Sequence, residues 1–118
     1  MEEIKVGEYV RIKNGPIRKV IAINEGKEKT IFGKYRLDKD YNNCRSVAEK
    51  KIVKPSENII DLIEVGDYVN GIKVTGVMSG YVYLDKIDIE TKKVKTLTDY
   101  QIKDIITKEQ INQVKYEV

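Results

Sequence analysis

Polar and apolar residues alternate in short runs along most of the chain, which is the two-residue period of strands with one buried face. In the first half, the runs predict strands at residues 9–12, 17–23, 30–35, 48–53 and 60–65. In the second half, they predict strands at residues 67–69, 71–77, 81–84, 87–89, 94–97, 100–106 and 116–118. Asn, Gly and Pro separate many of these runs, as turns between antiparallel strands require.

Two helical segments and one loop interrupt this alternation. Residues 56–58 predict a single helical turn, and a longer helix over residues 56–64 is the alternative to the strand at 60–65. Residues 108–114 predict a short helix, for which Thr107 is the N-cap and Gln110 completes a capping box. The segment 38–46 is rich in turn residues and has no strand period, so we predict a mobile loop there.

A seven-residue motif occurs twice in the chain. Residues 4–10 read Ile-Lys-Val-Gly-Glu-Tyr-Val, and residues 63–69 read Ile-Glu-Val-Gly-Asp-Tyr-Val, 59 positions later. An Asn-Gly pair follows each copy, and the segments 52–57 and 105–110 also correspond, at an offset of 53. Matching starts and ends indicate a tandem repeat of about 55–60 residues. The alternative is chance recurrence of a common pattern at the start of a strand.

Five short strands, with a helical turn before the last, are typical of a small SH3-like barrel. We therefore predict an all-β protein of two tandem SH3-like β-barrels packed together, with a short helical turn near the C-terminus. Repeat 1 is assigned to residues 1–62 and repeat 2 to residues 63–118, with no flexible linker. Because each repeat has few large apolar residues, the stretch 59–63 is predicted to form a core that the two repeats share.

The composition excludes many catalytic centres. The chain has 118 residues, no His and one Cys, so Ser-His-Asp triads, Cys₂His₂ zinc sites and an intrachain disulfide are impossible. Asp38, Asp40 and Asn43 lack the Gly and Glu that complete an EF-hand loop. We expect a protein that is not an enzyme, with no catalytic residue, cofactor or metal, and an exposed Cys44 thiol without a role.

The charge is distributed unevenly. The net charge is +3, with +5 on residues 1–59 and −2 on residues 60–118. A basic first half suits an anionic partner, although a solvated surface without a target accounts for the same asymmetry. The 18 Lys and 17 Ile are typical of an AT-rich genome, so the four Arg carry more of the signal.

Basic and aromatic residues of the first repeat are the main binding candidates. They flank one predicted hairpin and form a basic–aromatic–basic triplet: Arg11, Lys13, Arg18, Lys19, Lys34, Tyr35 and Arg36. Phosphate contacts combined with base stacking are how small barrels hold nucleotides or single strands. The alternative is that Tyr35 packs inside and the charges form a solvated strand face.

Two tyrosines of the second repeat complete the set of candidates. Tyr81 and Tyr83 alternate with Val82 and Leu84. If the aliphatic pair points inward, both tyrosines lie on one outer face, where they serve as aromatic anchors for a partner. The alternative is that they cover the other repeat.

Three motifs together resemble a known family. They are residues 58–71, the ending at residues 105–110, and the opening Val6-Gly7-Glu8-Tyr9-Val10-Arg11. They are similar to a family of small, mostly uncharacterised proteins of phages and prophages of low-GC Gram-positive bacteria, with a tandem Val-Gly-[Glu/Asp]-Tyr-Val repeat. The resemblance covers nearly the whole chain. It implies a phage accessory protein, many of which are inhibitors, but it transfers no catalytic residue.

We therefore expect a non-catalytic phage binding protein that inhibits host antiviral defence by occluding a protein or protein–nucleic-acid surface, as anti-CRISPR proteins do. The alternatives are a sponge that sequesters a nucleotide immune signal, and a nucleic-acid-binding module. The partner is a host defence protein or its nucleotide or nucleic-acid ligand. No apolar run reaches the roughly 18 residues of a membrane span, so we expect a protein of the host cytosol. The oligomeric state stays open, a homo-oligomer included.

Overall fold

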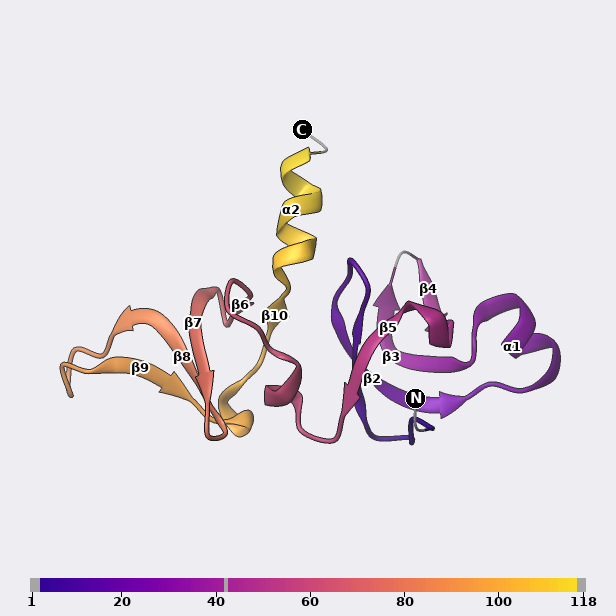
Figure 1. The fold of residues 1–118 in the computed structure, drawn as a ribbon, viewed down its shortest axis with the longest axis horizontal. Helices are drawn as coiled ribbons and strands as arrows, with labels where there is room; N and C mark the ends of the chain where they lie inside the picture. The colour runs from indigo at the N-terminus through magenta and orange to yellow at the C-terminus, as the bar shows by residue number, and fades with distance from the viewer. Residues whose placement is uncertain (1–2, 42, 117–118) are drawn as a thin grey trace. The chain divides into compact units, whose positions relative to one another are not determined.

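The computed structural model describes residues 3–41 and 43–116, with side chains as far as Asn112. The chain is mostly β, as predicted, and contains two five-stranded antiparallel sheets (Figure 1). Its contacts separate two compact units, Met1–Asn58 and Ile59–Val118, which we call unit 1 and unit 2. The repeats assigned from the sequence meet at residues 62 and 63, slightly later in the chain.

Unit 1 contains a sheet in the order β4-β3-β2-β1-β5. The strands are β1 (Tyr9–Ile12), β2 (Ile17–Ile23), β3 (Tyr35–Tyr41), β4 (Cys44–Val47) and β5 (Ile52–Ser56). The helix α1 (Gly26–Phe32) connects β2 to β3, and the 3₁₀ turn η1 (Glu49–Lys51) connects β4 to β5. The predicted strands at 9–12 and 17–23 are confirmed. Pro55 lies in β5 at the sheet edge, where a missing N–H is tolerated.

Three predictions for unit 1 are wrong in whole or in part. The first half of the strand predicted at 30–35 is helix α1, because the Lys- and Glu-rich residues before it continue helically into Thr30, Ile31 and Phe32, and β3 begins only at Tyr35. The strand predicted at 48–53 is correct only at residues 52–53, which begin β5, because η1 occupies Glu49–Lys51. The segment predicted as a mobile loop is the β3–β4 hairpin, in which Tyr41 pairs with Cys44 and Arg45 forms an ion pair with Asp40 at 2.8 Å.

Unit 2 contains a sheet in the order β10-β6-β7-β8-β9. The strands are β6 (Tyr68–Val69), β7 (Ile72–Met78), β8 (Tyr81–Ile87), β9 (Val94–Leu97) and β10 (Ile105–Ile106). Three helical segments accompany them: η2 (Ile59–Leu62), η3 (Asp99–Gln101) and α2 (Lys108–Tyr116). The capping box predicted for α2 is confirmed, since the Thr107 N–H donates to Gln110 Oε1 at 2.9 Å and the Gln110 N–H donates to Thr107 Oγ1 at 3.4 Å.

Around α2, the turn at Asp67 provides further contacts. The Lys108 N–H donates to Asp67 Oδ1 at 2.9 Å, and Lys108 Nζ lies 2.7 Å from Glu64 Oε1. This contact to the carboxylate raises the pKa of Lys108 above its ordinary value. The first turn of α2 is therefore joined to the turn at Asp67 by one backbone N–H hydrogen bond and by one ion pair.

Several predictions for unit 2 also need correction. The stretch 60–65 is not a strand: η2 covers Ile59–Leu62, so the helical alternative was closer. The strand predicted at 100–106 is reduced to β10 because η3 begins at Asp99. The strand predicted at 116–118 is contradicted at Tyr116, where α2 continues, and residues 117–118 lie outside the described part of the chain.

The two sheets have the same topology, a four-strand meander whose first strand also pairs with the fifth. The Gly7 N–H donates to Val20 O at 2.8 Å, and the Gly66 N–H donates to Val74 O at 3.0 Å. At the other end, Tyr9 pairs with Ser56 and Tyr68 pairs with Ile106. This pairing places the ends at an offset of 50, which corrects the 53 inferred from sequence.

Each unit has its own apolar core. The core of unit 1 consists of Ile4, Val10, Ile12, Val20, Tyr35, Leu37, Val47 and Ile52. The buried apolar residues of unit 2 are Ile60, Leu62, Ile63, Val69, Val74, Val82, Leu84 and Leu97. Within the described residues, neither sheet closes into a barrel, and no helix is long and apolar enough to cross a membrane. A core shared between the units stays a prediction.

Candidate functional site

The connection between β2 and β3 is the main difference between the units. Unit 2 joins the equivalent strands through a two-residue turn at Ser79 and Gly80, whereas unit 1 inserts α1. The helix has seven residues, no side-chain N-cap and no buried residue. Ile31 and Phe32, at its end, are 68% and 52% exposed. A helix this short gains little stability by itself, so burial and capping do not explain its presence.

Asn24 fixes the base of this insertion. Its N–H donates to Lys34 O at 2.7 Å, and its side-chain Nδ2 donates to Gly33 O at 2.9 Å. The same Nδ2 donates to Ser46 Oγ at 3.0 Å, which ties the insertion to β4. Gly33 has a φ of 108°, and a Cβ at this position would lie 2.5 Å from the carbonyl carbon of Val47. The end of α1 therefore rests directly on the backbone of β4.

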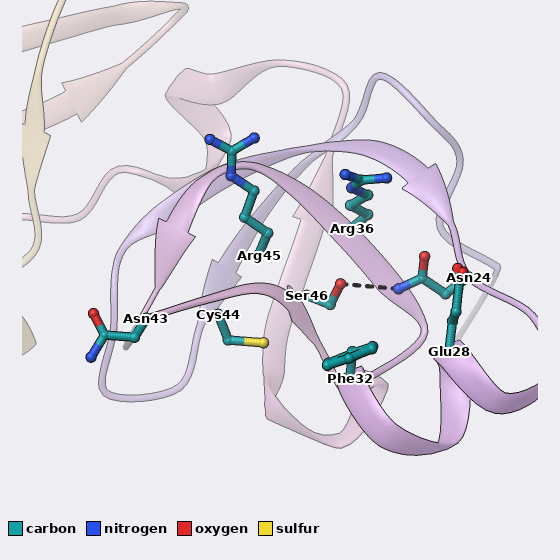
Figure 2. A pocket seen from close by; sticks show the side chains of 8 residues that line it. All are labelled: Asn24, Glu28, Phe32, Arg36, Asn43, Cys44, Arg45 and Ser46. Atoms are coloured by element: carbon teal, nitrogen blue, oxygen red, sulfur yellow. Dashed lines mark hydrogen bonds between the residues drawn. The ribbon is translucent and has the colours of Figure 1, made fainter.

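A cavity of about 340 Å³ lies between α1 and the β3–β4 hairpin, and we call it the α1 pocket. It is lined by Asn24, Glu28, Phe32, Arg36, Asn43, Cys44, Arg45 and Ser46. Figure 2 shows Asn24 and Ser46 joined at the centre, with the Cys44 thiol pointing toward the Phe32 ring. The volume falls at the lower end of the range of small-molecule sites.

The guanidinium groups of the two arginines in the α1 pocket differ in whether they already have a partner in the protein. Arg45 Nε donates to Asp40 Oδ1 at 2.8 Å, and Figure 2 shows its guanidinium directed away from Phe32. Arg36 is exposed, and its guanidinium forms no hydrogen bond or ion pair with the described residues. Glu28 also lines the pocket, yet no ion pair joins it to Arg36 in the described part of the chain. Arg36 is therefore the guanidinium that an anionic ligand would meet.

The structure brings only Arg36, of the residues predicted to bind, into the α1 pocket. Lys13 and Lys19 are exposed, and Lys19 Nζ lies 5.9 Å from the centre of the Tyr9 ring. Arg18 is half-buried and donates to Ile17 O at 3.1 Å. Lys34 lies with its Nζ 5.4 Å from the centre of the Tyr35 ring. These residues form no common concavity among the pockets described.

Two of the predicted contact residues are buried. Arg11 is 2% exposed, and Tyr35 is 0% exposed and belongs to the core of unit 1. β1 lies between β2 and β5, and three consecutive residues of β1 are buried. Alternation alone could not identify an inner face in such a strand. Tyr35 follows the alternative interpretation, in which the aromatic ring packs inside and the flanking Lys34 and Arg36 face outward.

The burial pattern predicted around the tyrosines of unit 2 agrees in part with the structure, and their role as anchors stays a prediction. Val82 and Leu84 are fully buried, as predicted. Tyr81 is 45% exposed, whereas Tyr83 is half-buried beside Gly76, with which it pairs across β7 and β8. Tyr81 is therefore the more accessible of the two tyrosines.

Sequence reasoning missed Asn24, Glu28, Phe32, Asn43 and Ser46, and it treated Cys44 as an exposed thiol without a role. Cys44 is only partly exposed and lines the α1 pocket. In the structure, residues 24–34 separate β2 from β3 in unit 1, whereas only residues 79–80 separate β7 from β8 in unit 2. Among the described residues, no group of three or more His, Cys, Asp or Glu side chains could hold a metal ion.

Comparison with known proteins adds no relative to this picture. No protein-family model matches the chain, and no match was found among curated proteins or solved structures. The resemblance to phage proteins therefore stays a prediction, and the function has to be argued from the geometry of the α1 pocket.

Proposed function

We propose that the protein is a non-catalytic binding protein whose α1 pocket holds a small anionic ligand with a flat ring, of the nucleotide class. The observation that carries this proposal is that one cavity is lined both by Arg36, whose guanidinium has no partner among the described residues, and by the half-exposed Phe32. A guanidinium binds phosphate through parallel hydrogen bonds, and an aromatic face stacks on a base. The side-chain amide of Asn43 lines the same cavity as a donor and acceptor, whereas Asn24 offers only its Oδ1 as an acceptor, because its Nδ2 already donates to Gly33 O and Ser46 Oγ.

The proposal assigns binding, and no reaction, to this pocket. Catalysis by an activated nucleophile needs a base within hydrogen-bonding distance of it. Cys44 and Glu28 are the reactive side chains that line the pocket, and no hydrogen bond joins Cys44 to a base among the described residues. With no His in the chain, the usual general base is missing as well.

We also propose that each unit is a small SH3-like fold in an open form. The support is a meander of four strands, a 3₁₀ turn before the fifth strand, and pairing of the fifth strand with the first. In the biological setting implied by the phage resemblance, the protein would inhibit host antiviral defence by sequestering a nucleotide signal. Of the functions expected from sequence, the pocket thus favours the nucleotide sponge.

Occlusion of a host protein surface is the second candidate. It is favoured by apolar side chains that unit 2 leaves exposed: Ile89 at 89%, Tyr100 at 93% and Tyr81 at 45%. Such side chains are typical anchors in protein interfaces. Direct nucleic-acid binding has less support, because Arg11 and Tyr35 are buried and cannot contact a strand.

The first test is binding of adenosine monophosphate by isothermal titration calorimetry. We expect wild-type protein to bind, and Arg36→Glu to weaken binding by at least tenfold, about 1.4 kcal/mol, because it replaces the phosphate partner with a like charge. Lys19→Glu is the matched control, since it makes the same charge change on an exposed residue outside the pocket. If neither adenosine nor guanosine monophosphate bound the wild type, or if both variants behaved alike, the proposed site would be wrong.

The second candidate is tested by capture of host proteins. Immobilised protein and an Ile89→Asp variant are exposed to lysate of a low-GC Gram-positive host, and the retained proteins are compared by mass spectrometry. Occlusion predicts a host protein that the wild type retains and the variant loses. Because Ile89 is exposed, stability should change by less than about 0.5 kcal/mol. Equal retention by both proteins would contradict a role for this residue.

A further inference from the structure

A second cavity shares part of its lining with the α1 pocket. Its volume is about 370 Å³, and its lining includes Lys29, Ile31, Tyr41 and Lys51. Phe32, Cys44 and Ser46 line both cavities, so they form a shared wall. Since one set of side chains separates the two cavities, a single ligand that passes over this wall would occupy both.

The cations around the two cavities are available for anions. Arg36 lines the first cavity, and Lys29 and Lys51 line the second. None of the three has a hydrogen bond or ion pair from its side chain to the described residues. Glu28 is the one acidic residue in either lining. Each cavity therefore combines unpaired positive charge with at most one carboxylate, which suits a ligand with an anionic group at each end.

Aromatic side chains line both cavities, where they could stack on the flat rings of a ligand. Phe32 forms part of the shared wall and is 52% exposed, so a face of its ring is open to solvent. Tyr41, at the end of β3, lines the second cavity and is half-buried. Stacking on such rings holds bases with little regard to their identity.

We propose that the two cavities form one composite site for a dinucleotide, a ligand with two phosphate groups and two flat rings. One phosphate pairs with Arg36 and the other with Lys29 and Lys51, while Phe32 lies between the bases. This inference rests on the proposed function of the α1 pocket and deepens it, since it specifies a ligand that spans Phe32. The exposed position of Phe32, which adds nothing to the core of unit 1, has a purpose in this arrangement.

The test compares adenosine monophosphate with 5′-phosphorylated diadenylate, pApA, by calorimetry at one salt concentration. We expect pApA to bind at least tenfold more tightly. Lys51→Glu should remove that advantage and leave binding of the monophosphate unchanged, whereas Arg36→Glu should weaken both. The control is Lys50→Glu, because Lys50 is the exposed neighbour of Lys51 in η1 and lines neither cavity.

The outcomes separate this inference from the proposed function. If the monophosphate binds in an Arg36-dependent way but pApA binds no more tightly, the composite site is wrong and the α1 pocket stands. Equal losses in Lys50→Glu and Lys51→Glu would indicate general charge attraction and would also overturn it. If neither compound binds the wild type, both proposals fail. Circular dichroism of each variant checks that the sheets are intact.

Discussion

Replacing Gly33 by alanine is expected to destabilise unit 1 by about 3 kcal/mol or more, since backbone strain and overpacking each cost about 1–3 kcal/mol. Gly33 has φ 108° and ψ 161°, a region that side chains with a Cβ avoid. The new Cβ would also lie 2.5 Å from the carbonyl carbon of Val47 and 2.7 Å from the Ala48 nitrogen. These are backbone atoms of β4 and its exit, so a rotamer change cannot relieve the contact.

Urea denaturation and hydrogen exchange of β3 and β4 measure this effect. Gly26→Ala is the matched control, because Gly26 also has a positive φ of 58° but has no atom within 4 Å of the Cβ position. It should cost only about 1 kcal/mol, the strain of a left-handed residue. The Gly33 variant should also lose monophosphate binding, since α1 and β4 must separate. Equal destabilisation by the two variants would show that the contact with β4 is not tight.

The second large effect is expected from Asp67→Ala, which should destabilise unit 2 by about 3 kcal/mol, since each buried donor left without a partner costs about 1–3 kcal/mol. Asp67 is 0% exposed. One carboxylate oxygen accepts the Glu64 N–H at 2.8 Å and the other accepts the Lys108 N–H at 2.9 Å. Its removal therefore opens the turn before β6 and detaches the first turn of α2 together.

The repeat supplies the control for this variant. Glu8 occupies the equivalent position in unit 1, where its Oε1 accepts the Lys5 N–H at 2.8 Å. Glu8 is only half-buried, so water can replace it, and Glu8→Ala should cost about 1 kcal/mol or less. Hydrogen exchange at Glu64 and Lys108 should speed up in the Asp67 variant. Unchanged exchange at Lys108 would contradict the role of Asp67 in holding α2.

The β1–β2 hairpin was predictable because alternation and turn residues agree there, whereas the β3–β4 hairpin lacked a strand period and was missed. The bounds 9–12 and 17–23 match β1 and β2, and the capping box of α2 was also read correctly. The errors lie in segments whose residues favour a strand in one part and a helix in another. Residues 30–32 are β-prone, yet they continue a helix begun by Gly26 to Lys29, and Gly33 ends it. In the same way, the match of residues 52–57 to 105–110 was a chance similarity, because strand pairing places the correspondence three residues away.

The candidate site was only partly predictable, for a geometric reason. Arg36 was selected for its charge, and it does line the α1 pocket. Arg11 was selected for the same reason. However, β1 lies between β2 and β5 and three of its four residues are buried, so alternation along this short strand could not predict that Arg11 is buried. Phe32, Asn24 and Ser46 come from three separate elements. Their proximity depends on how α1 folds back on β4, which is a tertiary contact.

The duplicated architecture, the mostly β character and the absence of His-based chemistry can all be read from the residue order. These properties follow from composition and from local period, which depend on neighbouring residues alone. The accessibility of the basic residues and the position of the cavities follow instead from the folded chain. Burial depends on strand order, and the α1 pocket exists because Gly33 lets the helix rest on β4. Contacts between residues that are distant in the chain determine this accessibility, and the local sequence pattern does not predict such contacts.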